Sequence, residues 1–173
     1  MSADRVSPSQ RADEVVRRRA ARVLVVDPGG HVLMIQGFDP HRPEDAYWYT
    51  VGGGLEPGET HLEAAVREVW EETGAVITAD DLVGPVHHDR GSFSFEGRTI
   101  HQEQVFYGWV TDRFDADPAG FEELESRSTI RVGWIDPATC RAGGEAVYPA
   151  VLERLVEVVL ETATSSRPPS TRS

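Results

Sequence analysis

The sequence contains no lysine and a single cysteine, Cys140. All 17 basic residues are arginines, which excludes chemistry that needs a lysine amine, such as a Schiff base or the lysine of a phosphate-binding loop. One cysteine permits no disulfide within the chain and cannot supply a cysteine-rich zinc site. These absences exclude several common kinds of site before any residue pattern is considered.

Long apolar runs are also missing. No stretch approaches the roughly 18 consecutive apolar residues that span a bilayer, and the first residues lack the apolar run of a secretory signal. We therefore expect a cytoplasmic protein that does not enter a membrane. The 29 acidic residues outnumber the 17 basic ones, and the formal net charge of −12 repels nucleic acids and anionic membranes. The expected partner is a small ligand that carries its own cations, and not a nucleic acid.

The length of 173 residues suits one domain with tails. Residues 1–15 and 164–173 are polar and show no apolar period, so we predict disordered tails there and a single domain over 16–163. A basic cluster near the start allows two interpretations, a nucleic-acid patch or the solvated beginning of the first strand. The acidic chain and the lack of interleaved aromatic residues favour the strand for this cluster, which comprises Arg17, Arg18, Arg19 and Arg22.

Apolar runs and turn residues predict the secondary structure. A β-hairpin is expected from the runs at 23–26 and 32–35 around the turn Asp27-Pro28-Gly29-Gly30, followed by a polar loop over 37–45. Further strands are expected through 47–51 and at 82–86, 92–95, 104–110 and 129–135, with helices at 60–73 and from 149 to about 161. This order predicts an α/β or α+β fold in which a mixed sheet lies between two helices.

The helix at 60–73 has recognisable signals at both ends. Thr60 and Glu63 have the spacing of a capping box, and Gly74 stands where a left-handed C-terminal cap is expected. An apolar stripe at spacings of three and four residues predicts the face that packs on the core, and it comprises Leu62, Ala65, Val66 and Val69.

A second face of the same helix carries Glu68, Glu71 and Glu72, three and four residues apart. Their like charges repel one another, and a hard divalent cation such as Mg²⁺, which prefers oxygen ligands and recruits substrate phosphates, would compensate them. The preceding glycines let the backbone approach closely, so the Gly53 carbonyl is a further candidate ligand. The alternative interpretation is a solvated acidic face beside a tight turn.

The complete spacing of Gly53, Glu59, Arg67-Glu68, Glu71-Glu72 and Gly74-Ala75 matches the Nudix box, and on this motif the chain resembles the Nudix hydrolase superfamily. Ala75 is smaller than the aliphatic residue that is usual at the last position. A looser resemblance extends over about residues 20–160. It implies an α/β/α sandwich whose mixed sheet is flanked by the box helix and a C-terminal helix.

The resemblance also implies roles for the box residues. Glu68, Glu71, Glu72 and the Gly53 carbonyl would bind Mg²⁺ or Mn²⁺, while Glu59 would pair with Arg67 and orient the helix against the preceding loop. Glu63 offers a local alternative partner, since it lies four residues before Arg67 on the same helix.

The activity implied is hydrolysis within the diphosphate of a nucleoside diphosphate linked to another moiety. Such a reaction needs charge neutralisation of phosphate oxygens and a carboxylate base that activates water. Glu71 is one candidate base, and Glu123 in the acidic loop over 122–125 is another, with His101 and Glu103 as further candidates. A nucleotide-sensing module without turnover is the alternative function, which the intact set of carboxylates disfavours.

Substrate contacts are less specified. Trp48, Tyr49 and Tyr148 are candidates for stacking a base, and Arg98 for binding phosphate, although core packing and hairpin solvation are ordinary roles for such residues. No second signature beyond the box identifies a subfamily, and Val51 stands where proline is frequent. The resemblance adds a homodimer to the expected assemblies, because dimers are common in the family.

Overall fold

The computed structural model describes residues 15–117 and 128–166. Its strands are β1 (Val15–Val26), β2 (Val32–Asp39), β3 (Arg42–Gly54), β4 (Val83–Phe95), β5 (Arg98–Val110), β6 (Thr129–Ile135) and β7 (Ala146–Val147). Its helices are α2 (His61–Thr73), the short η1 (Ala79–Asp81), α4 (Pro137–Ala142) and α5 (Leu152–Ser166). The predicted hairpin, both main helices and the strand at 129–135 are confirmed.

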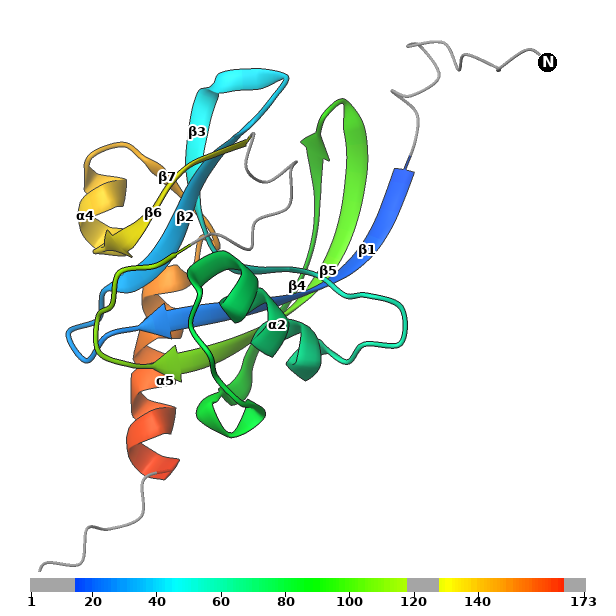
Figure 1. Ribbon diagram of the computed structural model, residues 1–173. Helices are drawn as coiled ribbons and strands as arrows, with labels where there is room; N and C mark the ends of the chain where they lie inside the picture. The colour runs from blue at the N-terminus through cyan, green and yellow to red at the C-terminus, as the bar shows by residue number, and fades with distance from the viewer. Residues whose placement is uncertain (1–14, 118–127, 167–173) are drawn as a thin grey trace, which may run out of the picture.

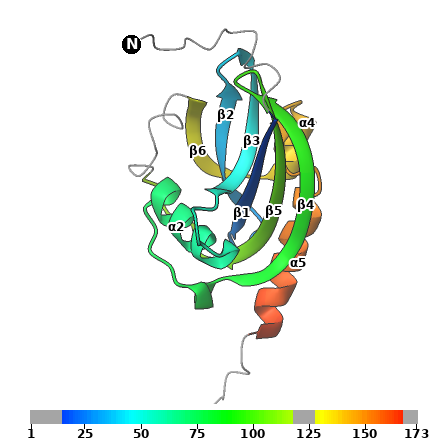
Figure 2. The same cartoon turned by 90° about the vertical axis from the view of Figure 1, so that its right-hand side faces the viewer.

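The strands of the described part of the chain form one mixed sheet in the order β4-β5-β1-β2-β3-β7, with β6 paired to β2. Strands β1 and β5 run parallel from Val15 opposite Thr99 to Val26 opposite Val110. Because β1 pairs with β2 at one end and with β3 over Ala20–Val23, the sheet cannot stay flat and curls, as Figure 2 shows.

Each face of the sheet is covered by one main helix (Figure 1). Val23 and Val25 of β1 share a core with the α2 residues Ala65 and Val69, whereas the alternate residues Leu24 and Val26 pack with α5. This follows from the two-residue period of a strand, which sends neighbouring side chains to opposite faces. The α/β/α sandwich predicted from the resemblance is therefore confirmed.

Two predicted boundaries are wrong. The polar stretch at 37–45 is not a loop, because β2 continues to Asp39 and β3 begins at Arg42. The Asp39 carboxylate accepts hydrogen bonds from the His41 amide, at 2.9 Å, and from the Glu96 amide of the β4–β5 turn, at 3.2 Å, so the buried side chain of Asp39 supports both hairpin tips.

The strands predicted separately at 82–86 and 92–95 are one strand, β4, which pairs with β5 from His87 through Phe95. Long-range pairing satisfies the backbone of the polar residues between them, and this information is absent from a local apolar pattern.

The predicted tails at 1–15 and 164–173 lie largely outside the described residues, although β1 begins at Val15 and α5 ends at Ser166. Within 15–117 and 128–166, no helix has the length and apolar character needed to cross a membrane.

Candidate active site

Helix α2 begins and ends where its capping residues predict. The Thr60 hydroxyl accepts from the Glu63 amide at 3.2 Å, and the Glu63 carboxylate accepts from the Thr60 amide at 2.9 Å. At the other end Gly74 has the left-handed φ of 73°, and its amide donates to the Trp70 carbonyl at 2.8 Å. These caps set the register of α2, and hence the direction of every side chain on it.

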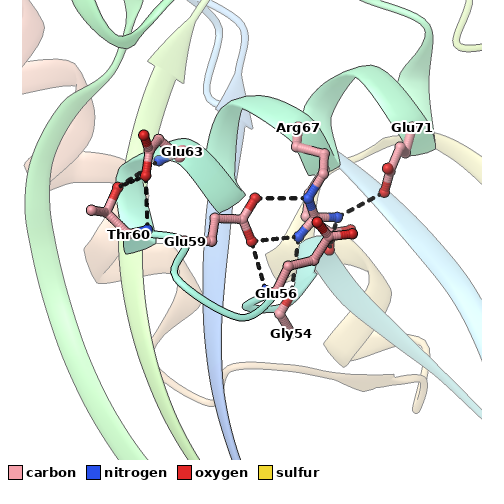
Figure 3. A network of polar contacts seen from close by, with 8 residues as sticks. Gly54, Glu56, Glu59, Thr60, Glu63, Arg67 and Glu71 are labelled. Atoms are coloured by element: carbon pink, nitrogen blue, oxygen red, sulfur yellow. Dashed lines mark hydrogen bonds and ion pairs between the residues drawn. The ribbon is translucent and has the colours of Figure 1, made fainter.

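Arg67 lies at the centre of a polar network that joins α2 to the preceding loop (Figure 3). Its Nε donates to Glu59 Oε1 at 2.8 Å, and its Nη2 donates to Glu59 Oε2 at 3.0 Å and to the Gly54 carbonyl at 2.9 Å. The predicted Glu59–Arg67 pair is confirmed, whereas Glu63 is used in the capping box. The guanidinium of Arg67 is the main reason that the pKa of Glu59 is lowered, and Glu59 in turn raises the pKa of Arg67.

The same guanidinium contacts two further carboxylates of α2. Its Nη1 donates to Glu68 Oε1 at 2.8 Å and to Glu71 Oε2 at 2.9 Å. The side chain of Glu68 is only 6% exposed, while that of Glu71 is 27% exposed and accessible to water. Arg67 thus binds carboxylates from the loop and from two positions on the helix, and holds them together as one cluster.

Glu72 joins the helix to the glycines at the end of β3. The Gly52 amide donates to Glu72 Oε2 at 2.6 Å, and the Glu72 side chain is buried. The neighbouring Gly53 lies against Glu68, since a Cβ atom added to Gly53 would come within 2.4 Å of Glu68 Oε1. A side chain at position 53 would therefore displace the Glu68 carboxylate from its place in the cluster.

The chemical types of these groups are those that a hard divalent cation binds. Carboxylate oxygens beside a backbone carbonyl are the donor set that Mg²⁺ and Mn²⁺ prefer, and the missing Cβ of Gly53 leaves the space that Glu68 enters. In the geometry described, Arg67 neutralises part of the carboxylate charge, and among residues 15–117 and 128–166 no three acidic, histidine or cysteine side chains converge on one ion position.

The structure separates the predicted substrate contacts. Trp48 is 2% exposed and belongs to the same core cluster as the α5 residues, with the Arg131 guanidinium 4.9 Å from its ring, so in this structure its side chain is not accessible for stacking a base. Tyr49 has the opposite orientation and lies near the carboxylates, where burial and then the charge of Glu72 raise the pKa of its phenol. Strand alternation separates these two neighbours.

The other two candidates contact residues outside the network around Arg67. Tyr148 is exposed and packs edge-on against Tyr47, with ring centroids 5.9 Å apart. Arg98 follows the turn of the β4–β5 hairpin, opposite Phe95.

The structure gives the contacts of two of the three candidate bases outside the box. His101 contacts the Ser92 hydroxyl at 2.5 Å and Glu103 accepts from Arg90 at 2.9 Å, so both belong to pairs across β4 and β5. Glu123 and its acidic loop lie outside the described residues.

Sequence reasoning did not predict the contact of Arg22 with the glycines at the end of β3. Its guanidinium reaches the backbone of β3 and donates to the carbonyl of Gly52, directly before the proposed ligand carbonyl of Gly53. The one available signal is a charged residue between the apolar Ala21 and Val23, which are both fully buried.

Comparison with known proteins agrees with this geometry. A profile of the NUDIX domain matches residues 16–155, which is most of the chain and includes the whole cluster around Arg67. The chain belongs to the Nudix family. The mixed curled sheet with its two flanking helices is the fold of this family.

Two individual relatives share 30% and 33% of the aligned residues with the chain. The chain is 33% identical over 139 residues to an RNA pyrophosphohydrolase from Erythrobacter litoralis, covering 69% of this chain and 76% of that protein. It is 30% identical over 114 residues to a MutT-like protein from Streptomyces ambofaciens, covering 66% of this chain and 60% of the relative's length.

A solved Nudix structure supports the same fold. The dihydroneopterin triphosphate pyrophosphohydrolase of E. coli superposes with a TM-score of 0.61 at 19% identity, over 86% of this chain and 99% of the other.

Proposed function

We propose that this Nudix protein is a pyrophosphohydrolase that cleaves the diphosphate linkage of a small nucleotide derivative with Mg²⁺ or Mn²⁺. The observation that carries the proposal is the convergence of Glu59, Glu68 and Glu71 on Arg67, beside Glu72 on the Gly52 amide. Family membership and a relative named as a pyrophosphohydrolase support the same reaction class.

The metal site in this proposal consists of Glu68, Glu71, Glu72 and the Gly53 carbonyl. A divalent ion held there supplies the positive charge that phosphate oxygens need during attack by water. Arg67 and Glu59 orient the carboxylates, because their bonds connect the helix with the loop at Gly54. In this proposal the ion supplies the positive charge, and the side chains position the reacting groups and accept the proton of the attacking water.

Glu71 is the carboxylate to which we assign the base. Its side chain is more exposed than that of Glu68, 27% against 6%, so water reaches it without displacing the core. Glu123 is the second candidate for this role. Replacing each by glutamine and comparing the pH dependence of kcat distinguishes them, because loss of the base removes the acidic limb of the profile.

The substrate class is tested with a panel of nucleoside triphosphates, ADP-ribose, NADH, nucleotide sugars, dinucleoside polyphosphates and a 5′-triphosphorylated oligoribonucleotide. We expect Mg²⁺-dependent hydrolysis of a small nucleotide, which gives two phosphomonoesters from a substituted diphosphate, or a nucleoside monophosphate and pyrophosphate from a triphosphate. EDTA is expected to abolish the activity and excess Mg²⁺ to restore it. Because the net charge is −12, the oligoribonucleotide is expected to be a poor substrate.

The panel also tests the alternative of a nucleotide sensor. Binding of a nucleotide by calorimetry without hydrolysis in either Mg²⁺ or Mn²⁺ would overturn the enzyme proposal and favour a sensing module. Unchanged nucleotide affinity after EDTA treatment would contradict phosphate binding through a metal.

A further inference from the structure

Arg22 is a charged residue in the most deeply buried part of β1. Ala20 and Ala21 before it, and Val23 after it, are fully buried, and the Arg22 side chain itself is partly buried. A guanidinium in such surroundings loses hydration, and this cost is offset only when its N–H groups find acceptors.

The acceptors of Arg22 lie on two neighbouring strands. Its Nη1 donates to the carbonyls of Gly52 and Thr50 on β3, the latter at 3.4 Å, and its Nε donates to Gln104 Oε1 on β5 at 3.3 Å. Gln104 is fixed in turn, because its amide donates to Asp89 on β4 at 3.1 Å. These contacts form a polar row across β4, β5, β1 and β3.

The row ends at Gly52, a residue whose backbone also contacts α2. The Gly52 carbonyl accepts from the Arg22 cation while the Gly52 amide donates at 2.6 Å to the Glu72 carboxylate. The carbonyl of Gly52 thus binds a cation and its amide binds an anion. Charge-assisted hydrogen bonds of this kind are stronger than neutral ones.

The surroundings of Gly52 leave this residue little freedom. Its φ is 128°, in the region that favours glycine, and a Cβ atom added there would lie 2.2 Å from the Ala21 carbonyl oxygen. Gly52 is paired with Arg22 in the β1–β3 register. Strand alternation places Arg22 on the face of Leu24, toward α5, whereas Glu72 reaches Gly52 from α2. Gly52 therefore connects groups on the two faces of the sheet.

We propose that Arg22 is a positioning residue for the metal site. By holding the Gly52 carbonyl, it fixes the Gly52 amide against Glu72 and sets the direction of the adjoining Gly53 carbonyl. The inference rests on the proposed function, because it assigns Glu72 and Gly53 to the metal. Residues that orient metal ligands commonly change metal affinity or activity by about 10-fold to 100-fold when they are replaced.

The test compares Arg22→Met, Arg22→Lys and Arg17→Met in the full chain. Mn²⁺ binding to the substrate-free protein is measured by electron paramagnetic resonance, and kcat and KM are measured on the best substrate of the panel. Arg17 is the matched control, since it is an exposed arginine on the same strand.

We expect Arg22→Met to weaken Mn²⁺ binding about tenfold and to lower kcat about tenfold, with KM changed by less than about twofold. Arg22→Lys keeps one charged donor group that can reach Gly52 but loses the planar fork of the guanidinium, and it is expected to recover part of both losses. Arg17→Met is expected to behave as the wild type. A general loss of structure would instead lower the folded fraction, and with it the apparent kcat and the number of Mn²⁺ sites per chain, while the Mn²⁺ affinity of the remaining sites would stay that of the wild type.

A folded Arg22→Met variant whose Mn²⁺ affinity and kcat stay within about twofold of wild type would overturn the positioning role of Arg22. It would leave the proposed function unaffected. Should Arg22→Met fail to fold, Gln104→Leu decides, because it removes the acceptor that aligns the Arg22 Nε; unchanged Mn²⁺ affinity there would overturn the proposal. Failure of the proposed function has a different signature, in which the wild type neither binds Mn²⁺ nor hydrolyses the panel.

Discussion

Helices α2 and α5 cover opposite faces of the same sheet and use their polar sides differently. Both bury an apolar stripe, with Ala65 and Val69 on α2 and Leu152 and Val159 on α5. On α2 the next stripe of residues is also turned inward, so that the carboxylates of Glu68 and Glu72 are buried. On α5 the comparable residue Glu157 is exposed to water.

The difference arises from what each helix packs beside. Helix α2 lies against the glycines at the end of β3, where backbone groups come close enough to bind a carboxylate, and Arg67 offsets the charge. Helix α5 meets Gly108 of β5, where a Cβ atom would come within 2.4 Å of Val159, so the close approach there serves apolar packing. Glycine in a strand permits close contact, and the facing side chain determines whether that contact is chemical or structural.

The largest effect that separates the two helices is expected from Glu72→Gln. The substitution preserves shape and an acceptor oxygen for the Gly52 amide but removes the charge that the proposed metal needs. We expect kcat/KM to fall about 10³-fold, which corresponds to several kcal/mol of transition-state stabilisation, with an unchanged circular dichroism spectrum. The matched control is Glu157→Gln on α5, which is expected to keep wild-type activity. Near-normal activity of folded Glu72→Gln would refute the role of Glu72.

The opposite pattern is expected from Leu152→Ala on α5. Leu152 is fully buried, and truncation of such a leucine leaves a cavity that costs about 2–5 kcal/mol of unfolding free energy. Urea denaturation measures this loss, while kcat of the folded fraction is expected to match the wild type. A stable variant with reduced kcat would show that α5 contributes to the site and would abolish the contrast between the helices.

The smallest effect is a change in pH dependence for Glu59→Gln. Bonding with Arg67 lowers the pKa of Glu59 in the folded protein, so ionised Glu59 stabilises the fold above its ordinary pKa of 4.5, and this contribution is lost as the pH falls through the lowered value. The difference in unfolding free energy between wild type and Glu59→Gln is therefore expected to be largest above about pH 5 and to shrink toward pH 3. Urea titrations from pH 3 to pH 7 measure it, and a difference independent of pH would contradict the assignment.

Local spacing was sufficient to predict the capped ends of α2 and the presence of Glu68, Glu71 and Glu72 on one face of it. The caps Thr60 and Gly74 lie within a few residues of the groups they satisfy, and the glutamates follow one another on consecutive turns. The Glu59–Arg67 pair could not be predicted from spacing alone, because a local alternative at Glu63 has equally suitable spacing. The resemblance to the Nudix box favoured Glu59, and the capping box explains why Glu63 is occupied elsewhere.

Contacts between distant strands were not predictable in the same way. The polar row from Asp89 through Gln104 to Arg22 depends on the parallel pairing of β1 with β5, whose residues are far apart in the chain. Trp48 and Tyr49 are adjacent aromatic residues with the same plausible roles, and only their assignment to opposite faces separates a core residue from a neighbour of Glu72.

The sequence by itself determined the length and register of α2, its capped ends and the carboxylates on one side, because those interactions span a single helical turn or two. The tertiary structure alone decided which backbone groups meet those carboxylates, since the curl of the sheet brings β1 beside the end of β3. Helical periodicity is set by the backbone geometry of neighbouring residues, whereas the pairing of distant strands depends on the packing of the whole sheet.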